Sequence, residues 1–165
     1  MLIYLLRHGI AVNRTDPACP PDPERPLTRK GIEKTRDVAR ALRALRAKPD
    51  ALLTSPFLRA AQTAEIAAEA LAFPREKTRT LDCLKPEGSP AEFWKEVGRL
   101  RARVVLCCGH SPHLDHVIAH ALGARSDITR LKKSGVACLE VTAFSPMKAW
   151  LLWLSPPKFL RALAD

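Results

Sequence analysis

Short apolar runs alternate along this chain with longer stretches in which apolar residues recur at helical spacing. Ile3–Leu6, Ala51–Thr54 and Arg103–Cys108 are continuous apolar or β-branched runs typical of buried strands. Between the first two, apolar residues repeat every three or four positions over residues 32–45, and Thr28 stands where a helix N-cap is expected. The pattern therefore predicts strands that alternate with helices.

The rest of the chain continues this alternation. Further helices are predicted at Phe57–Leu71, Ala91–Arg101, Pro112–Leu122 and Pro156–Leu163, a third strand at Thr78–Leu81, and an antiparallel strand pair at Val136–Val141 and Lys148–Leu154. This order is typical of an α/β fold, and we expect a three-layer α/β/α sandwich with a mostly parallel central sheet. Neither an internal repeat nor a linker interrupts the pattern, so we expect a single domain over residues 1–165.

The composition narrows the class of protein. Hydrophobic residues make up 47% of the chain, which excludes a disordered or low-complexity protein. The N-terminal run MLIYLL is too short and lacks the flanks of a signal peptide, and the sequence has no apolar run of about 18 residues that would span a membrane. The five cysteines have no paired spacing and are typical of reduced thiols. We expect a cytoplasmic protein that does not bind a membrane.

The formal net charge of +10 favours an anionic partner, which is a phosphorylated substrate, an acidic protein face or a nucleic acid. Many of the basic residues in Arg25–Lys48 lie opposite the apolar stripe of the predicted helix, as on a solvated helix face. Charge alone therefore does not choose between these partners.

Polar residues stand where three of the predicted strands end. Arg7-His8-Gly9 follows the first strand, Ser55-Pro56-Phe57-Leu58-Arg59 follows the second, and Gly109-His110-Ser111-Pro112 follows the strand at 103–108. Because ligands of α/β sheets gather at the carboxyl ends of the strands, we expect these residues at one edge. Two guanidiniums can clamp a phosphate, one imidazole can attack phosphorus, and a second can stabilise the transferring group. The set predicts phosphoryl transfer.

These motifs resemble those of the histidine phosphatase (phosphoglycerate mutase-like) superfamily. The resemblance rests on Arg7-His8-Gly9 after an N-terminal strand, on SPFLRAAQT at residues 55–63, and on Gly109-His110-Ser111-Pro112. The short length and Arg25-Pro26-Leu27-Thr28 make it look like the SixA-type phosphohistidine phosphatase branch. The resemblance implies a phosphoglycerate mutase-like fold in which His8 is the nucleophile, Arg7 and Arg59 bind phosphoryl oxygens, and His110 stabilises the transferring group. It implies no metal and no other cofactor.

The chain departs from the larger relatives at the general acid. Those relatives carry an acidic residue after the third strand, where this sequence has Cys83. Asp82 and Glu87 are the candidate substitutes. Without an acid at the site an alcohol leaving group would suffer most and a phosphoramidate less, which favours a phosphohistidine substrate on a signalling or phosphotransfer protein. Small phosphorylated metabolites are the alternative substrates.

Two further alternatives remain at this stage. His116 and His120 lie four residues apart behind His113, a spacing at which a helix could bind zinc. A catalytically inactive, basic module that binds RNA or polyphosphate would also explain the charge, although no aromatic-plus-basic stretch for single strands is present. We expect no nucleic-acid partner and a monomer or weak dimer. The proline-rich loop Asn13–Pro26 begins just after His8, and our hypothesis is that it gates the site.

Overall fold

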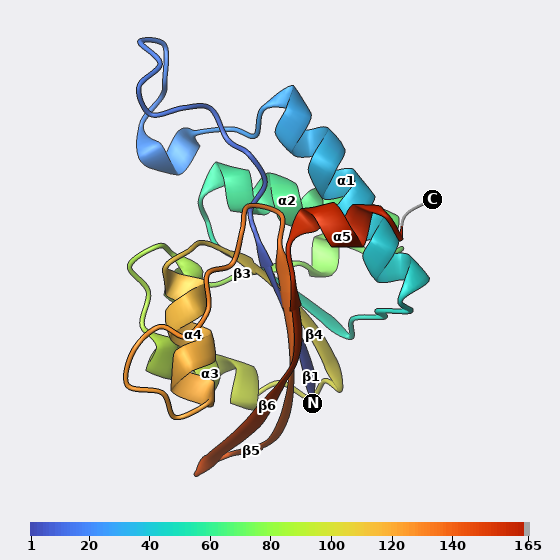
Figure 1. The fold of residues 1–165 in the computed structure, drawn as a ribbon, viewed down its shortest axis with the longest axis vertical. Coiled ribbons are helices and arrows are strands. Elements are labelled where there is room, and N and C mark those ends of the chain that lie inside the picture. Colours follow the sequence, from blue (N-terminus) through green and yellow to red (C-terminus); the bar gives the residue numbers. More distant parts are fainter. Residues whose placement is uncertain (164–165) are drawn as a thin grey trace.

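One mixed sheet runs through the computed structural model, which describes residues 1–163 (Figure 1). Its strands, in the spatial order β3-β2-β4-β1-β5-β6, are β1 (Leu2–Arg7), β2 (Ala51–Thr54), β3 (Arg79–Thr80), β4 (Val104–Gly109), β5 (Val136–Phe144) and β6 (Met147–Ser155). The first four in that order are parallel, and β5 and β6 are antiparallel to their neighbours. The predicted α/β class is confirmed.

Helices cover both faces of this sheet and make three layers, as predicted (Figure 1). One face packs against α1 (Arg29–Ala44), α2 (Leu58–Ala70) and α5 (Pro157–Arg161). The other packs against α3 (Pro90–Gly98) and α4 (His113–Ala121). The central strand β1 shows why the sheet is buried on both sides, because Ile3 and Leu5 pack toward α3 and α4 while Tyr4 and Leu6 pack toward α1 and α2.

Several boundaries differ from the prediction for local reasons. Thr28 caps α1 as predicted, with its hydroxyl accepting from the amide of Gly31 at 3.0 Å. Helix α2 begins at Leu58 rather than Phe57, because Ser55 turns the chain and its Oγ accepts from the amide of Phe57 at 3.3 Å. Strand β3 has two residues instead of four, and α3 ends at Gly98 rather than Arg101. These shifts leave the layers unchanged.

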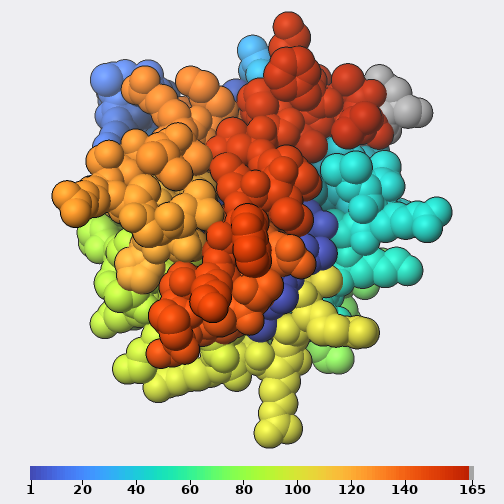
Figure 2. Space-filling view, turned by 60° about the horizontal axis from the view of Figure 1, so that its bottom comes forward, coloured from blue at the N-terminus to red at the C-terminus, as the bar shows by residue number. Residues whose placement is uncertain are grey.

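The C-terminal hairpin forms one edge of the sheet. Figure 2 shows β6 and α5 along one face of the molecule, where the side chains of Trp150, Leu152 and Phe159 are exposed. Over residues 1–163, none of the helices has both the length and the hydropathy that crossing a membrane requires.

Candidate active site

The carboxyl ends of three neighbouring strands meet at one place in the sheet. Arg7 at the end of β1 pairs with Gly109 at the end of β4. The amide of His8 donates to the carbonyl of Gly109 at 2.9 Å, and the amide of Ser55, which follows β2, donates to the carbonyl of Cys108 at 3.0 Å. The register of β2, β4 and β1 therefore places the residues after each strand side by side, as the sequence predicted.

A cavity of about 500 Å³ opens at this edge. Its lining comprises the three strand ends and the proline-rich loop, with residues Arg7, His8, Ile10, Ala11, Val12, Asn13, Arg14, Arg25, Arg59, Pro86, His110, Ser111 and Lys133. Four arginines and one lysine are in this set, and within the described chain no Asp or Glu belongs to it. The cavity is therefore suited to an anion.

His8 is buried and lines the cavity, and a backbone contact defines its tautomer. Its Nδ1 lies 2.7 Å from the carbonyl oxygen of Gly9, and a carbonyl only accepts, so Nδ1 carries the proton. Its Nε2 therefore has a lone pair, toward which Arg59 Nε–H points at 3.3 Å. Burial lowers the pKa of His8 to about 3 against the opposing Gly9 hydrogen bond, and the charges of nearby cations add to the lowering. At neutral pH the imidazole is uncharged and nucleophilic.

His110 stands beside His8, with the two ring centroids 5.0 Å apart. Its Nε2 lies 2.9 Å from Ser55 Oγ, and its Nδ1 is buried without a partner among the described residues. Phe57 packs edge-on against the same ring. Burial lowers the pKa of His110 to about 2, with the charges of His8 and Arg59 adding to it, so this imidazole is also neutral.

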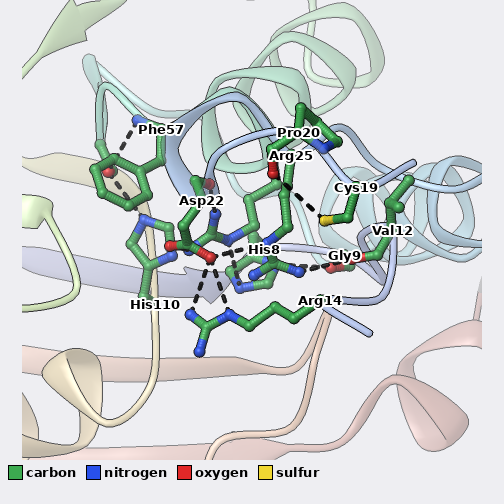
Figure 3. Close-up of polar contacts among 12 residues, drawn as sticks. His8, Gly9, Val12, Arg14, Cys19, Pro20, Asp22, Arg25, Phe57 and His110 are labelled. Atoms are coloured by element: carbon green, nitrogen blue, oxygen red, sulfur yellow. Dashed lines mark hydrogen bonds and ion pairs between the residues drawn. The ribbon is translucent and has the colours of Figure 1, made fainter. Parts of the chain in front are cut away.

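Arg59 is held by the proline-rich loop. Its Nη1 donates to the backbone carbonyl of Asp22 at 2.6 Å, and its Nη2 donates to Asp22 Oδ2 at 3.1 Å. Asp22 Oδ1 accepts from Arg25 Nε at 2.8 Å and from Arg14 Nε at 3.0 Å (Figure 3). Burial raises the pKa of Asp22, but the contacts with Arg25 and Arg59 outweigh it and lower the pKa, so the carboxylate is ionised. One carboxylate thus contacts three guanidiniums.

Arg7 and Lys133 complete the cationic wall. Arg7 Nη1 donates to the carbonyl of Leu131 at 2.7 Å, and its Nε has no partner among residues 1–163. Lys133 is an exposed residue that nevertheless lines the cavity, and desolvation followed by the charges of Arg7, Arg25 and Arg59 lowers its pKa. The positive charges of four arginines and one lysine therefore lie around the same cavity.

The two candidate acids lie elsewhere. Asp82 is exposed and pairs with Lys85 at 2.9 Å, and it lines a different hollow beside α3. Glu87 is exposed and is not in the cavity lining, although its neighbour Pro86 is. Neither carboxylate therefore belongs to the lining of the cavity beside His8.

The three histidines of α4 point to different places. His113 is fully buried, whereas His116 is half exposed and its Nε2 lies 3.4 Å from Asp127 Oδ2. His120 is exposed. Within residues 1–163, the structure forms no group of three or more His, Cys, Asp or Glu side chains that could hold a metal ion.

Sequence reasoning missed the roles of Ser55 and Asp22 in this geometry. Ser55 was part of a recognised motif, but its contact with His110 depends on the turn before α2. Asp22 lies in a 3-10 turn, Asp22–Glu24, inside the proline-rich loop. The proline content predicted a loop and carried no signal for the direction of the Asp22 side chain.

Comparison with known proteins identifies relatives over most of the chain. Residues 3–84 match the family model of the histidine phosphatase superfamily (branch 1). An uncharacterised protein of Picosynechococcus sp. is 38% identical over 170 residues, covering 94% of this chain and 100% of that protein. Phosphohistidine phosphatase SixA of Escherichia coli is 30% identical over 122 residues, covering 72% of this chain and 73% of that protein.

Two solved structures are similar to this chain over nearly its whole length. A structure of the protein histidine phosphatase SixA complexed with tungstate superposes with a TM-score of 0.84 at 28% identity, covering 97% of this chain and 99% of that chain. A putative alpha-ribazole-5'-P phosphatase of Escherichia coli has a TM-score of 0.78 at 17% identity, over 95% of this chain and 98% of that chain, and so shares the fold.

Proposed function

This chain belongs to the histidine phosphatase superfamily, in its SixA-type branch, and we propose that it hydrolyses phosphohistidine on a protein through a covalent phospho-His8 intermediate. The observation that carries the proposal is the state of His8. Its imidazole is buried and neutral, its proton is on Nδ1, and its Nε2 accepts from Arg59 Nε at 3.3 Å beside a cavity lined by cations. An uncharged imidazole with a defined lone pair is the form that attacks phosphorus.

The first step forms a bond between His8 Nε2 and phosphorus and breaks the bond between phosphorus and the substrate imidazole. The electron pair of the broken bond leaves with that imidazole, whose other ring nitrogen already carries a proton, so that a neutral imidazole is released. Two guanidiniums neutralise the negative charge that the phosphoryl oxygens carry in the transition state. They belong to Arg7 and to Arg59, whose Nε lies 3.3 Å from His8 Nε2. His110, 5.0 Å away between ring centroids, stabilises the same group.

In the second step water attacks phosphorus, the bond to Nε2 breaks, and inorganic phosphate leaves. His8 recovers its lone pair, and the proton on Nδ1 remains in the hydrogen bond to Gly9. Neither step requires a metal ion, because guanidinium groups supply the positive charge.

No carboxylate belongs to the cavity lining of the described chain, and the one that contacts its arginines, Asp22, is ionised and so has no proton to donate; this supports a phosphoramidate substrate. An alkoxide leaving from a phosphate ester needs a proton from a general acid. An imidazole leaves far more readily, so a site without such an acid is adequate for phosphohistidine. Asp82 and Glu87, both exposed and outside the lining, are not needed for this reaction.

The experiment offers chelator-treated protein a phosphohistidine peptide, a phosphoserine peptide and an aryl phosphate, with His8→Ala as the control. Quenched samples are examined for acid-labile phosphate on His8. We expect chelator-resistant turnover that is fastest with phosphohistidine, a label on His8, and no turnover by His8→Ala. Tungstate, which is bound in the related SixA structure, is expected to inhibit competitively.

Other results would change the proposal. Faster turnover of small phosphate esters than of phosphohistidine would replace the protein substrate with a metabolite. Loss of turnover with chelator would refute the metal-free mechanism. Salt-sensitive retention of RNA or polyphosphate without any hydrolysis would indicate a binding module instead.

A further inference from the structure

The cavity holds more positive charge than one transferring phosphoryl group uses. Arg7 and Arg59 suffice to clamp the phosphoryl oxygens beside His8. Three further cations, Arg14, Arg25 and Lys133, line the same cavity. The structure places an anion of the protein itself, the Asp22 carboxylate, in contact with three guanidiniums. The contacts are with Arg14 at 3.0 Å, Arg25 at 2.8 Å and Arg59 at 3.1 Å.

Burial distinguishes the guanidiniums from the carboxylate that they hold. The side chains of Arg59 and Arg25 are 2% and 10% exposed, whereas that of Asp22 is 34% exposed. The two arginines are thus built into the protein, and the carboxylate lies at the open side of the cluster. Asp22 therefore marks an anion position that is accessible from outside.

Backbone carbonyls would keep the guanidiniums in place if the carboxylate moved away. Arg25 Nη1 donates to the carbonyl of Val12 at 2.6 Å, and Arg59 Nη1 donates to the backbone carbonyl of Asp22 at 2.6 Å. Neither contact involves the Asp22 side chain. A rotation of that side chain into solvent would therefore open an anion position and leave these two backbone contacts in place.

This position adjoins the site of phosphoryl transfer. Within one guanidinium, Arg59 Nε faces His8 Nε2 at 3.3 Å while Nη2 faces the Asp22 carboxylate at 3.1 Å. A ligand that fills both places therefore holds its two anionic groups close together in space.

We propose that the place of the Asp22 carboxylate is a second anion subsite, where an acidic group of the substrate next to the phosphoryl group displaces the Asp22 side chain. The ligand chemistry is a carboxylate or phosphate close to the transferred phosphoryl, supplied by an acidic residue beside phosphohistidine or by a small dianionic metabolite. The proposal rests on the proposed function, since it takes His8 as the site of transfer. Desolvation and then the charges of Arg7, Arg25 and Arg59 lower the pKa of Lys133, and a bound anion would relieve the second of these effects.

The test compares non-hydrolysable ligands by calorimetry and needs no turnover. Phosphonoacetate has its carboxylate near the phosphonate, and phosphonohexanoate has the same two groups far apart. We expect phosphonoacetate to bind roughly tenfold more tightly, as a charge-assisted contact at a partly buried site gives. Equal affinities would overturn the subsite and leave the proposed function standing. Failure of both ligands and of inorganic phosphate to bind would refute both.

Two variants test which residues are responsible. Arg14→Ala removes an exposed guanidinium and is expected to lower the affinity ratio by about twofold to fivefold. Asp22→Asn removes the internal competitor and is expected to raise the ratio at least about threefold. Arg29→Ala, the matched control, removes the same charge from a surface site that pairs with Glu33 and should leave the ratio unchanged. A ratio that Arg14→Ala and Asp22→Asn both leave unaltered would overturn the assignment.

A second arm distinguishes the source of the acidic group. Phosphohistidine peptides with Glu or Gln beside the modified residue are compared in kcat/KM. A preference for Glu that is reduced in Arg14→Ala and kept in Arg29→Ala indicates a protein source. Equal values for the two peptides, together with selective binding of phosphonoacetate, indicate a small dianionic ligand.

Discussion

The buried imidazole of His113 is expected to make the fold sensitive to acid. His113 is fully buried between α3 and α4, lies against Phe93, and has no hydrogen-bond partner within residues 1–163 on either ring nitrogen. Burial lowers its pKa to about 4, with His116 adding to the effect, from an unfolded value of about 6.5. Between these values the unfolded chain binds a proton that the folded chain excludes, so the free energy of unfolding falls as the pH falls.

The size of this effect follows from the two pKa values. The folded and unfolded pKa values of His113 differ by about 2.5, so the free energy of unfolding is about 3 kcal/mol lower below pH 4 than at neutral pH. About 2 kcal/mol of this loss is reached by about pH 5. His113→Leu removes the titrating group and leaves an apolar side chain of similar size in an apolar site. Because both ring nitrogens are unpartnered, the substitution at neutral pH should change the free energy of unfolding by no more than about 1 kcal/mol.

The assay is urea unfolding followed by tryptophan fluorescence at about pH 7.5 and about pH 5. From about pH 7.5 to about pH 5 the free energy of unfolding of His113→Leu should fall by about 2 kcal/mol less than that of the wild type. His8 and His110 are present in both proteins, so their titration cancels in the comparison. His120→Leu, which changes an exposed histidine of the same helix, is the control and should follow the wild type. Equal losses in His113→Leu and the wild type would refute the reasoning.

Three other outcomes are expected. Because the lowered pKa of about 3 keeps His8 neutral, kcat/KM corrected for substrate ionisation should stay level down to about pH 5, and an acid limb near 6.5 would contradict this. Ser55→Ala removes the contact to His110 Nε2 and should lower kcat about tenfold in steady-state assays with little change in KM. Gly31→Ala places a Cβ atom against the backbone carbonyl of Ile10 and should reduce the free energy of unfolding by about 1–3 kcal/mol in urea titrations, so an unchanged midpoint would show that α1 can shift.

The layers and the meeting of the strand ends could be predicted from the sequence because both depend on local patterns. A continuous apolar strand such as Ile3–Leu6 is buried on both faces wherever it lies in the sheet. His8 and His110 directly follow two such strands, so their proximity requires only that β1 and β4 be parallel neighbours. The positions of His8 and His110 therefore follow from the burial and pairing of the strands that precede them.

The loop contacts could not be predicted because no periodic pattern determines them. Asp22 reaches Arg59 only because a 3-10 turn folds the proline-rich segment over the cavity. Asp82 and Glu87 stand close in sequence to Pro86, which does line the cavity, yet both side chains turn to solvent. His113 follows His110 by three residues and begins α4, where it is buried against Phe93. In each case the direction of one side chain follows from tertiary packing.

The contact between His8 and Gly9 connects both steps of the proposed reaction. When Nε2 bonds to phosphorus, the Nδ1 proton stays on the ring, because the Gly9 carbonyl at 2.7 Å accepts a hydrogen bond but is not a base. The phosphorylated ring is therefore an imidazolium, which is a good leaving group. Burial that keeps the free imidazole neutral opposes this positive charge, whereas the bound phosphoryl group, which is negative, stabilises it. The ring is thus a nucleophile before phosphoryl transfer and a leaving group after it, with its proton on the same atom throughout.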